Sequence, residues 1–346
     1  MEDIFDELLS NTQKRDYDEY LKDEFSAERE QVQRGIALEK QIVADFENFI
    51  HSRGKELGLE LVTLSEDDIA KARTVLYNGQ VVAVDGRKEK PLDVVSGIFC
   101  EVGVATVSYK TMHEPSVKCM SITSHIEDST TKEDYYENSR KERVNETDVT
   151  NAMIYWELEA CLDAAKTATW VLKDGPAMHP GLVWKDSATC FSHLEKVIAA
   201  KNIVGIVKDF RAAESLWRYG RCLKPGQYLV VYRGVGQWVK DIGKEGKLSA
   251  DFKQGPGAKI VKGVFKAGRS FWIFEAHQDT VHQAMPVVMA DALNNKRGMP
   301  QLIDLADKIL GNRFPSGLYG KKINREFLQH GMDYYLDIVD ERMLRG

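Results

Sequence analysis

The sequence predicts a mixed α/β fold in which helices cover the sheet. Three apolar segments close together in the chain favour a strand meander, because consecutive strands usually pair. Strands then alternate with helices, and the last part of the chain indicates helices alone, which together are typical of a mixed sheet flanked by helices. The expected strands are 81–86, 97–111, 113–126, 168–176, 203–210, 228–234, 259–267 and 270–276. The expected helices are 3–56, 150–166, 190–201, 211–220, 278–294, 299–311 and 322–345, so the fold would carry helical N- and C-terminal extensions.

Composition is that of an ordinary globular protein. The chain has 346 residues, of which 43% are hydrophobic and 29% are charged. No apolar run reaches the roughly eighteen residues that a membrane helix needs. The chain starts with MEDIFDELL, whereas a secretory signal starts with basic residues and an apolar stretch. We therefore expect a cytoplasmic protein without a membrane segment.

Charge is distributed unevenly along the chain. Residues 1–60 hold 16 acidic and 8 basic residues, a net charge of −8, against −6 for the whole chain. We expect this segment to be an acidic helical arm, followed by one domain over residues 61–346. Residues 240–269 instead hold eight basic and three acidic residues. This basic strip has the composition to track a nucleic-acid backbone, with Trp238, Phe252 and Phe265 stacking on bases. The alternative is a solvated hairpin face, with these aromatic residues in the core.

Two of the expected strands end in an Asp-Gly pair. Asp85 follows the apolar run 81–84, and Asp174 follows Val171, Leu172 and Lys173. Each pair is also a common turn signal, so one alone would indicate only a turn. Adjacent strand ends would bring the two carboxylates together, and close carboxylates repel unless a cation neutralises them. Hard divalent cations such as Mg²⁺ and Mn²⁺ prefer oxygen ligands of this kind.

The helix between these strands offers a third acid. Glu157 lies within the apolar stripe of residues 150–166, whereas Glu159 lies on the polar face. Helical spacing therefore predicts that Glu157 points inward and Glu159 outward. A buried Glu needs a partner, usually a cation, although a Glu at the edge of a stripe is also able to reach solvent or pair with a Lys.

An Asp on the first strand, a Glu on the first long helix and an Asp on a later strand form the carboxylate layout of RNase H-like nucleases. Four segments, in order over about residues 77–310, resemble motifs of the NurA nuclease family. They are AVDG (83–86), WELEA before VLKDGP (156–176), IVGIVK (203–208) and GMPQLIDLAD (298–307). The resemblance implies an RNase H-like mixed sheet flanked by helices, so residues 61–346 would be a NurA-like nuclease domain.

The resemblance also implies an activity and a site. NurA proteins are Mn²⁺- or Mg²⁺-dependent DNA nucleases that work as dimers with the hexameric ATPase HerA. Asp85, Glu157 and Asp174 would be metal ligands, and Lys208 would approach a phosphate, although a solvent-exposed Lys is an equal alternative at that position. The chain contains no P-loop sequence, so a separate motor would have to supply ATP hydrolysis.

The sequence departs from the family pattern at three positions. Arg87 stands where the family usually has Ser, Met299 where it has Tyr, and Asp307 where it has His. Asp307 would supply a hard oxygen in place of a nitrogen, so it is a candidate fourth ligand that favours Mg²⁺, with Asp304 as the alternative. The departures keep open a catalytically silent subunit that binds a motor ATPase. Another RNase H-like nuclease acting on RNA is the second alternative. Roles in DNA end processing and in phage defence are both compatible with the sequence.

Overall fold

The computed structural model describes residues 26–94, 97–125, 146–183, 187–208, 214–241, 250–314 and 318–331. The chain forms two compact units, residues 1–49 and 50–346. The arm boundary expected at residue 60 stays a prediction. Helix α3 (Ser26–Leu57) is the N-terminal described element, and residues 1–25 of the expected arm lie outside the described ranges. Among the described helices, none is long and apolar enough to cross a membrane.

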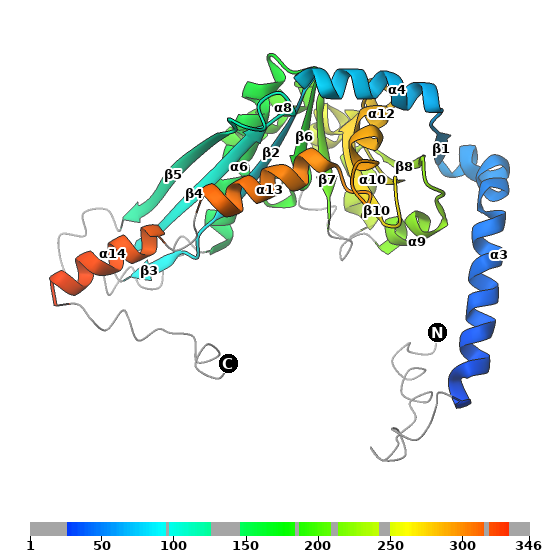
Figure 1. The fold of residues 1–346 in the computed structure, drawn as a ribbon, viewed down its shortest axis with the longest axis horizontal. Coiled ribbons are helices and arrows are strands. Elements are labelled where there is room, and N and C mark those ends of the chain that lie inside the picture. Colours follow the sequence, from blue (N-terminus) through cyan, green and yellow to red (C-terminus); the bar gives the residue numbers. More distant parts are fainter. Residues whose placement is uncertain are drawn as a thin grey trace. The chain divides into compact units, whose positions relative to one another are not determined.

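The second unit is built on one ten-stranded sheet (Figure 1). Its order is β1-β8-β9-β10-β7-β6-β2-β4-β3, and β5 pairs with β4. The strands are β1 (Glu60–Thr63), β2 (Val81–Lys88), β3 (Leu92–Val94), β4 (Gly97–Val107), β5 (Ser116–His125), β6 (Trp170–Asp174), β7 (Ile203–Val207), β8 (Gln227–Arg233), β9 (Ile260–Lys266) and β10 (Phe271–His277).

One end of this sheet, from β5 to β7, has RNase H-like topology. Strands β2, β4 and β5 form an antiparallel meander, and β2 is also parallel to β6, which is parallel to β7. In the RNase H-like order, the first strand of a three-stranded meander lies next to two further strands that run parallel to it. The strands β5, β4, β2, β6 and β7 have this order, so the expected fold class is confirmed. Beyond β7 the sheet continues through the antiparallel strand β10.

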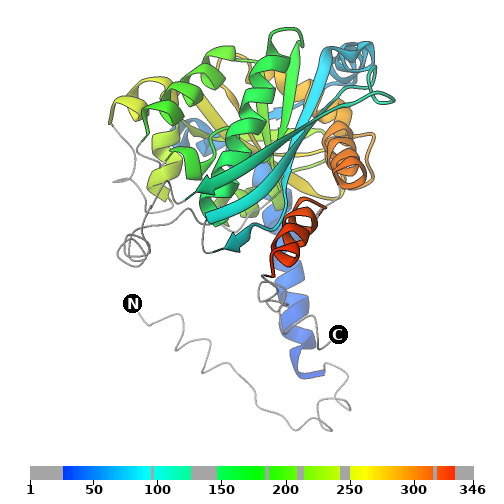
Figure 2. The same cartoon turned by 90° about the vertical axis from the view of Figure 1, so that its left-hand side faces the viewer.

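Helices cover both faces of the sheet. Helices α6 and α13 both pack on β2, β4 and β6, and they lie on opposite sides of these strands (Figure 2). The described helices of this unit are α4 (Glu66–Val75), α6 (Glu146–Ala165), α7 (Pro180–Val183), α8 (Ala188–Ala200), α9 (Glu214–Cys222), α10 (Val235–Asp241), α11 (Ala250–Gln254), α12 (Val281–Ala292), α13 (Gln301–Arg313) and α14 (Leu318–Gln329), with the short helices η1 (Leu76–Gln80) and η3 (Pro256–Lys259).

Strand alternation determines what each face presents to its helix. Ala83 of β2, Leu172 of β6 and Ile206 of β7 belong to the large buried cluster that includes the apolar face of α13. Side chains two residues apart on a strand share a face. We call this side of the sheet the α13 face, and the opposite side the α6 face. The next residues on the α13 face are therefore Asp85 and Asp174, at the ends of the apolar runs.

Candidate active site

Asp85 is a buried carboxylate on β2, the middle strand of the five RNase H-like strands. Its side chain is 6% exposed, and it lies opposite Ala105 of β4 on the α13 face. Its Oδ1 accepts a hydrogen bond from the backbone N–H of Gly86 at 2.9 Å. Burial, and then the neighbouring carboxylates of Asp174 and Glu157, raise the pKa of Asp85 to about 8. The structure thus gathers the predicted acids around Asp85.

Asp174 and Lys208 form an ion pair beside Asp85. Asp174 is the last residue of β6, and Lys208 directly follows β7. The Lys208 Nζ lies 2.5 Å from the Asp174 Oδ2, and the Lys208 side chain is 38% exposed. Burial disfavours the ammonium charge, but the carboxylates of Asp174, Asp85 and Asp307 together outweigh burial and raise the pKa of Lys208. Lys208 therefore stays charged at the open side of the acidic cluster.

The chain after Asp174 folds back tightly over β7. Gly175 has a φ of 84°, and its N–H donates to the Ile206 carbonyl at 2.8 Å. A Cβ on Gly205 would lie 2.4 Å from the Ala177 nitrogen, so this close approach requires glycine in β7. The Asp-Gly pair is thus a turn as well as a strand end, which fixes the position of the Asp174 side chain.

A buried ion pair that the sequence analysis missed holds the far end of this turn. The Glu275 carboxylate accepts from the Met178 N–H at 2.9 Å and from the Lys262 Nζ at 3.0 Å. The Lys262 ammonium also lies 4.0 Å from the centre of the Trp238 ring. An acid within the apolar strand SFWIFEA was the available signal, because a buried Glu needs a cationic partner.

Glu157 approaches the cluster from α6, on the other face of the sheet. Its side chain is buried, whereas Glu159 is 38% exposed and reaches His193 on α8 at 3.1 Å, as the helical spacing predicted. The Glu157 Oε2 lies 2.7 Å from the Nζ of Lys173, which is also fully buried. Burial opposes the charge on Lys173, but its acidic neighbours, Glu157 foremost, together outweigh burial and raise the pKa of the ammonium. Lys173, like Glu275 and Lys262, is a residue near the site that the sequence pattern did not indicate.

Asp307 lies at the exposed edge of the cluster on α13. Its charge contributes to the raised pKa values of Asp85 and Lys208, so it lies within electrostatic range of both. Asp304 instead pairs with Lys308 at 2.7 Å along the same helix. The structure therefore brings Asp307, and not Asp304, to the other predicted acids. Arg87 follows on the same face of β2, with its Nη1 3.5 Å from the place of a Cβ on Gly311.

The three aromatic residues considered for base stacking, in or beside the basic strip, do not lie on the surface. Trp238, Phe252 and Phe265 are 5%, 4% and 0% exposed, so these aromatic residues belong to the core. Lys262 is also buried, in its pair with Glu275. Residues 242–249 lie outside the described ranges. The prediction that these aromatic side chains stack on bases is therefore wrong, and the alternative of core packing holds.

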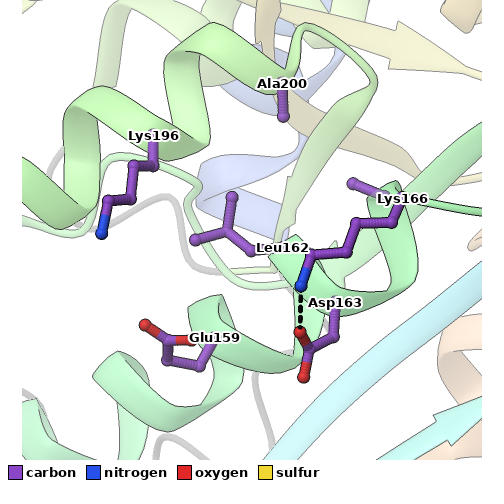
Figure 3. Close-up of a pocket in the computed structure, with 7 residues that line it drawn as sticks. Glu159, Leu162, Asp163, Lys166, Lys196 and Ala200 are labelled. Carbon is purple, nitrogen blue, oxygen red and sulfur yellow. Dashed lines mark hydrogen bonds and ion pairs between the residues drawn. The ribbon is translucent and has the colours of Figure 1, made fainter.

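A surface hollow of about 430 Å³ lies between α6 and α8, away from this cluster (Figure 3). Its charged lining includes Glu159, Asp163, Lys166 and Lys196. Asp163 and Lys166 pair with each other at 2.9 Å. The hollow is thus on the Glu159 side of α6, and the acids around Asp85 do not line it.

The carboxylate oxygens of the acidic cluster are the donors that a hard cation prefers, although the side chains are too far apart to enclose one. Within the described ranges, no three acidic, histidine or cysteine side chains converge closely enough to hold a metal ion. The lysines explain this spacing, because Lys208 holds Asp174 and Lys173 holds Glu157. Asp85 is nevertheless buried among carboxylates that raise its pKa, so a cation there would relieve the repulsion.

Comparisons with known proteins show only distant likenesses. No family profile and no characterised sequence matches the chain. Solved structures that resemble the fold include Endonuclease V from Ciona intestinalis in complex with a 24mer DNA that contains an inosine followed by a ribo-adenosine. Its TM-score is 0.32 at 11% identity, over 72% of this chain and 98% of that one. The catalytic domain of human Endonuclease V has a TM-score of 0.33 at 11% identity, over 86% and 98% of the two chains. At these TM-scores the likenesses assign no activity, and function has to be argued from the site itself.

Proposed function

We propose that the protein is a divalent-metal-dependent nuclease that hydrolyses phosphodiester bonds in DNA. One observation carries the proposal: buried Asp85 lies at the centre of an RNase H-like sheet, within electrostatic range of Asp174, Glu157, Asp307 and Lys208. Buried carboxylates gathered in this way are typical of sites that bind Mg²⁺ or Mn²⁺. The NurA resemblance of the sequence points to the same chemistry and to the same residues.

The residues have separable roles in this proposal. Asp85, Asp174 and Asp307 offer oxygen ligands to Mn²⁺ or Mg²⁺, with Glu157 behind them on α6. When bound, the ion supplies Lewis acidity towards the scissile phosphate and the hydrolytic water. Lys208, charged and 38% exposed, is placed to attract and orient a phosphate group.

A cleavage assay tests the function. Purified protein is incubated with single- and double-stranded DNA and RNA, each with Mn²⁺, Mg²⁺ or EDTA. We expect cleavage of DNA that requires the metal and disappears in Asp85→Asn and in Asp174→Asn, because asparagine keeps the shape but loses the charge. Asp304→Asn, which changes an exposed acid on α13, is the matched control. A variant of Asp85 or Asp174 that cleaves at the wild-type rate would exclude this site, and preference for RNA would favour the alternative substrate.

The cellular context is proposed from the NurA resemblance. The protein would act as a homodimer with a HerA-like hexameric ATPase, in DNA end processing or in phage defence. The P-loop sequence that a motor requires is missing from the sequence, so ATP-driven movement along DNA would come from the partner.

A catalytically silent subunit that binds the ATPase is the second candidate. The observation that favours it is the occupation of two predicted ligands, Asp174 and Glu157, by lysine ammonium groups. The same assay separates the candidates, because a silent subunit would leave every substrate intact in both metals, with and without the ATPase.

A further inference from the structure

The two lysines of the site lie on opposite faces of the sheet. Asp174 follows Leu172 in strand alternation and shares the α13 face with Asp85. Lys173 lies between Leu172 and Asp174 in the sequence and is in register with Val84 of β2. Its side chain therefore points to the α6 face. There it meets Glu157. The sheet therefore lies between the Glu157–Lys173 pair on the α6 face and the acids on the α13 face.

Both oxygens of Glu157 are already occupied. Oε2 lies 2.7 Å from the Lys173 Nζ, and the two side chains are 4% and 1% exposed. Oε1 packs on the backbone of Gly86, since a Cβ there would lie 2.4 Å away. The Lys173 Nζ also donates to the Asp174 carbonyl at 2.6 Å. The Glu157 carboxylate is therefore enclosed between the Lys173 ammonium and the Gly86 backbone.

Charge balance gives the same division. On the α13 face, the three carboxyl groups of Asp85, Asp174 and Asp307 lie within electrostatic range of one ammonium group, that of Lys208, so acidic groups are in excess there. On the α6 face, Glu157 and Lys173 cancel. A divalent cation would relieve the repulsion among the carboxylates of the α13 face, whereas Lys173 already balances the charge of Glu157.

We propose that the Lys173 ammonium takes the place of a second cation at Glu157, so that the protein binds one divalent ion, on the α13 face. This inference rests on the proposed metal-dependent function and deepens it. Glu157 is then the buried structural partner of Lys173, and not a metal ligand. The ion is held by acids of the α13 face alone.

Metal stoichiometry tests this inference without an activity readout. Mn²⁺ is titrated into the metal-free full-length protein, and bound ions are counted by calorimetry and by the electron paramagnetic resonance of free Mn²⁺. We expect one ion per chain in the wild type. In Asp85→Asn we expect an affinity lower by about 100-fold or more, beyond the loss that an outer-shell partner causes.

A paired variant separates Glu157 from the ligands. Glu157→Gln with Lys173→Met removes both buried charges together, so that neither is left unpaired. We expect it to bind one Mn²⁺ with wild-type affinity, like the control Asp163→Asn with Lys166→Met, which removes an exposed pair on the same helix.

The outcomes are distinguishable. Two ions per wild-type chain, or loss of the ion in a folded paired variant, would overturn this inference while leaving a metal-dependent nuclease intact. The wild-type count needs no variant, so it decides the matter even if the paired variant does not fold. No binding in the wild type would overturn the metal-dependent function as well.

Discussion

At the scale of single residues, two glutamates on α6 have opposite environments although they are two positions apart. Glu157 is buried against Lys173, whereas Glu159 is 38% exposed beside His193. Removing one partner of a buried ion pair leaves an uncompensated charge. We therefore expect Glu157→Gln to lower the free energy of unfolding by about 3–5 kcal/mol, and Glu159→Gln to change it by about 0–1 kcal/mol. Urea unfolding of the metal-free proteins measures both, and equal effects would contradict the assignment of the two faces.

Position 86 requires a glycine because the Glu157 side chain lies against the β2 backbone there. A Cβ at this position would lie 2.4 Å from the Glu157 Oε1, and Lys173 leaves the carboxylate no free direction to move. We expect Gly86→Ala to destabilise the fold by about 1–3 kcal/mol through overpacking. Gly35→Ala is the matched control, because nothing lies within 4 Å of that Cβ. It should stabilise α3 by about 1 kcal/mol. Thermal melts of the two variants that shift in the same direction would refute this reading.

The positions of single residues were predictable where one sequence pattern determines them. The apolar runs before Asp85 and Asp174, and the helical spacing of Glu157, suffice to predict a shared acidic cluster. Lys173 was missed because it stands inside an apolar strand next to the more noticeable Asp174. Strand alternation would have found it, since it places Lys173 on the face opposite Asp174, where a buried Glu157 needs a cation.

At the scale of elements, α13 is anchored at both ends, and this positions Asp307. At its start, the Leu302 N–H donates to the buried Asp291 carboxylate at 2.9 Å, and the Tyr109 hydroxyl donates to the same carboxylate at 2.7 Å. At its end, Phe314 packs on Gly103 of β4, where a Cβ would lie 2.7 Å from the ring. The helix therefore has little freedom to move away from the sheet.

The Asp291 anchor should make stability depend on pH. Burial raises the pKa of Asp291 to about 6, against the opposing hydrogen bonds from Tyr109 and Leu302. The folded state then binds the proton more tightly than the unfolded chain. The contribution of Asp291 is therefore complete below pH 3.8, the ordinary pKa of an Asp, and is lost as the pH rises through about 6. Relative to Asp291→Asn, the wild type should lose about 3 kcal/mol over this range. Chemical denaturation at a series of pH values measures the difference, and a constant difference would exclude a titrating Asp291.

Elements were predictable where they are long or strongly apolar. The meander and the strands β6 and β7 follow from apolar runs, and α6 from its helical stripe. Strand β1 was missed because it has only four residues, and η1 because Gly79, with a φ of 73°, interrupts any regular pattern there. Helix α4 was missed although Ser65 and Asp68 form a capping box, which is a readable helix start.

At the scale of the whole molecule, the pairing of neighbouring strands can be predicted from the sequence in one part of the sheet and not in the other. The order within the RNase H-like part of the sheet follows from the meander and from alternating strands and helices. The antiparallel insertion of β10 between β7 and β9 does not, because local periodicity contains no information about which distant strand will be the neighbour. That insertion brings Glu275 next to the turn after Asp174, so one part of the site's support was also beyond sequence reasoning.

The division of the chain into two units predicts that motor binding and cleavage are separable. All five predicted site residues and the entire sheet lie in residues 50–346, whereas the acidic segment with a net charge of −8 lies in residues 1–60. An acidic segment favours docking to a basic partner surface. Deletion of residues 1–30 should therefore weaken binding to a HerA-like ATPase while Mn²⁺-dependent cleavage by the isolated protein continues near the wild-type rate. Titration of the ATPase by calorimetry, beside the cleavage assay, measures both. Unchanged affinity in the deletion variant would remove the acidic arm from the interface, and loss of cleavage would show that the two units act together in catalysis.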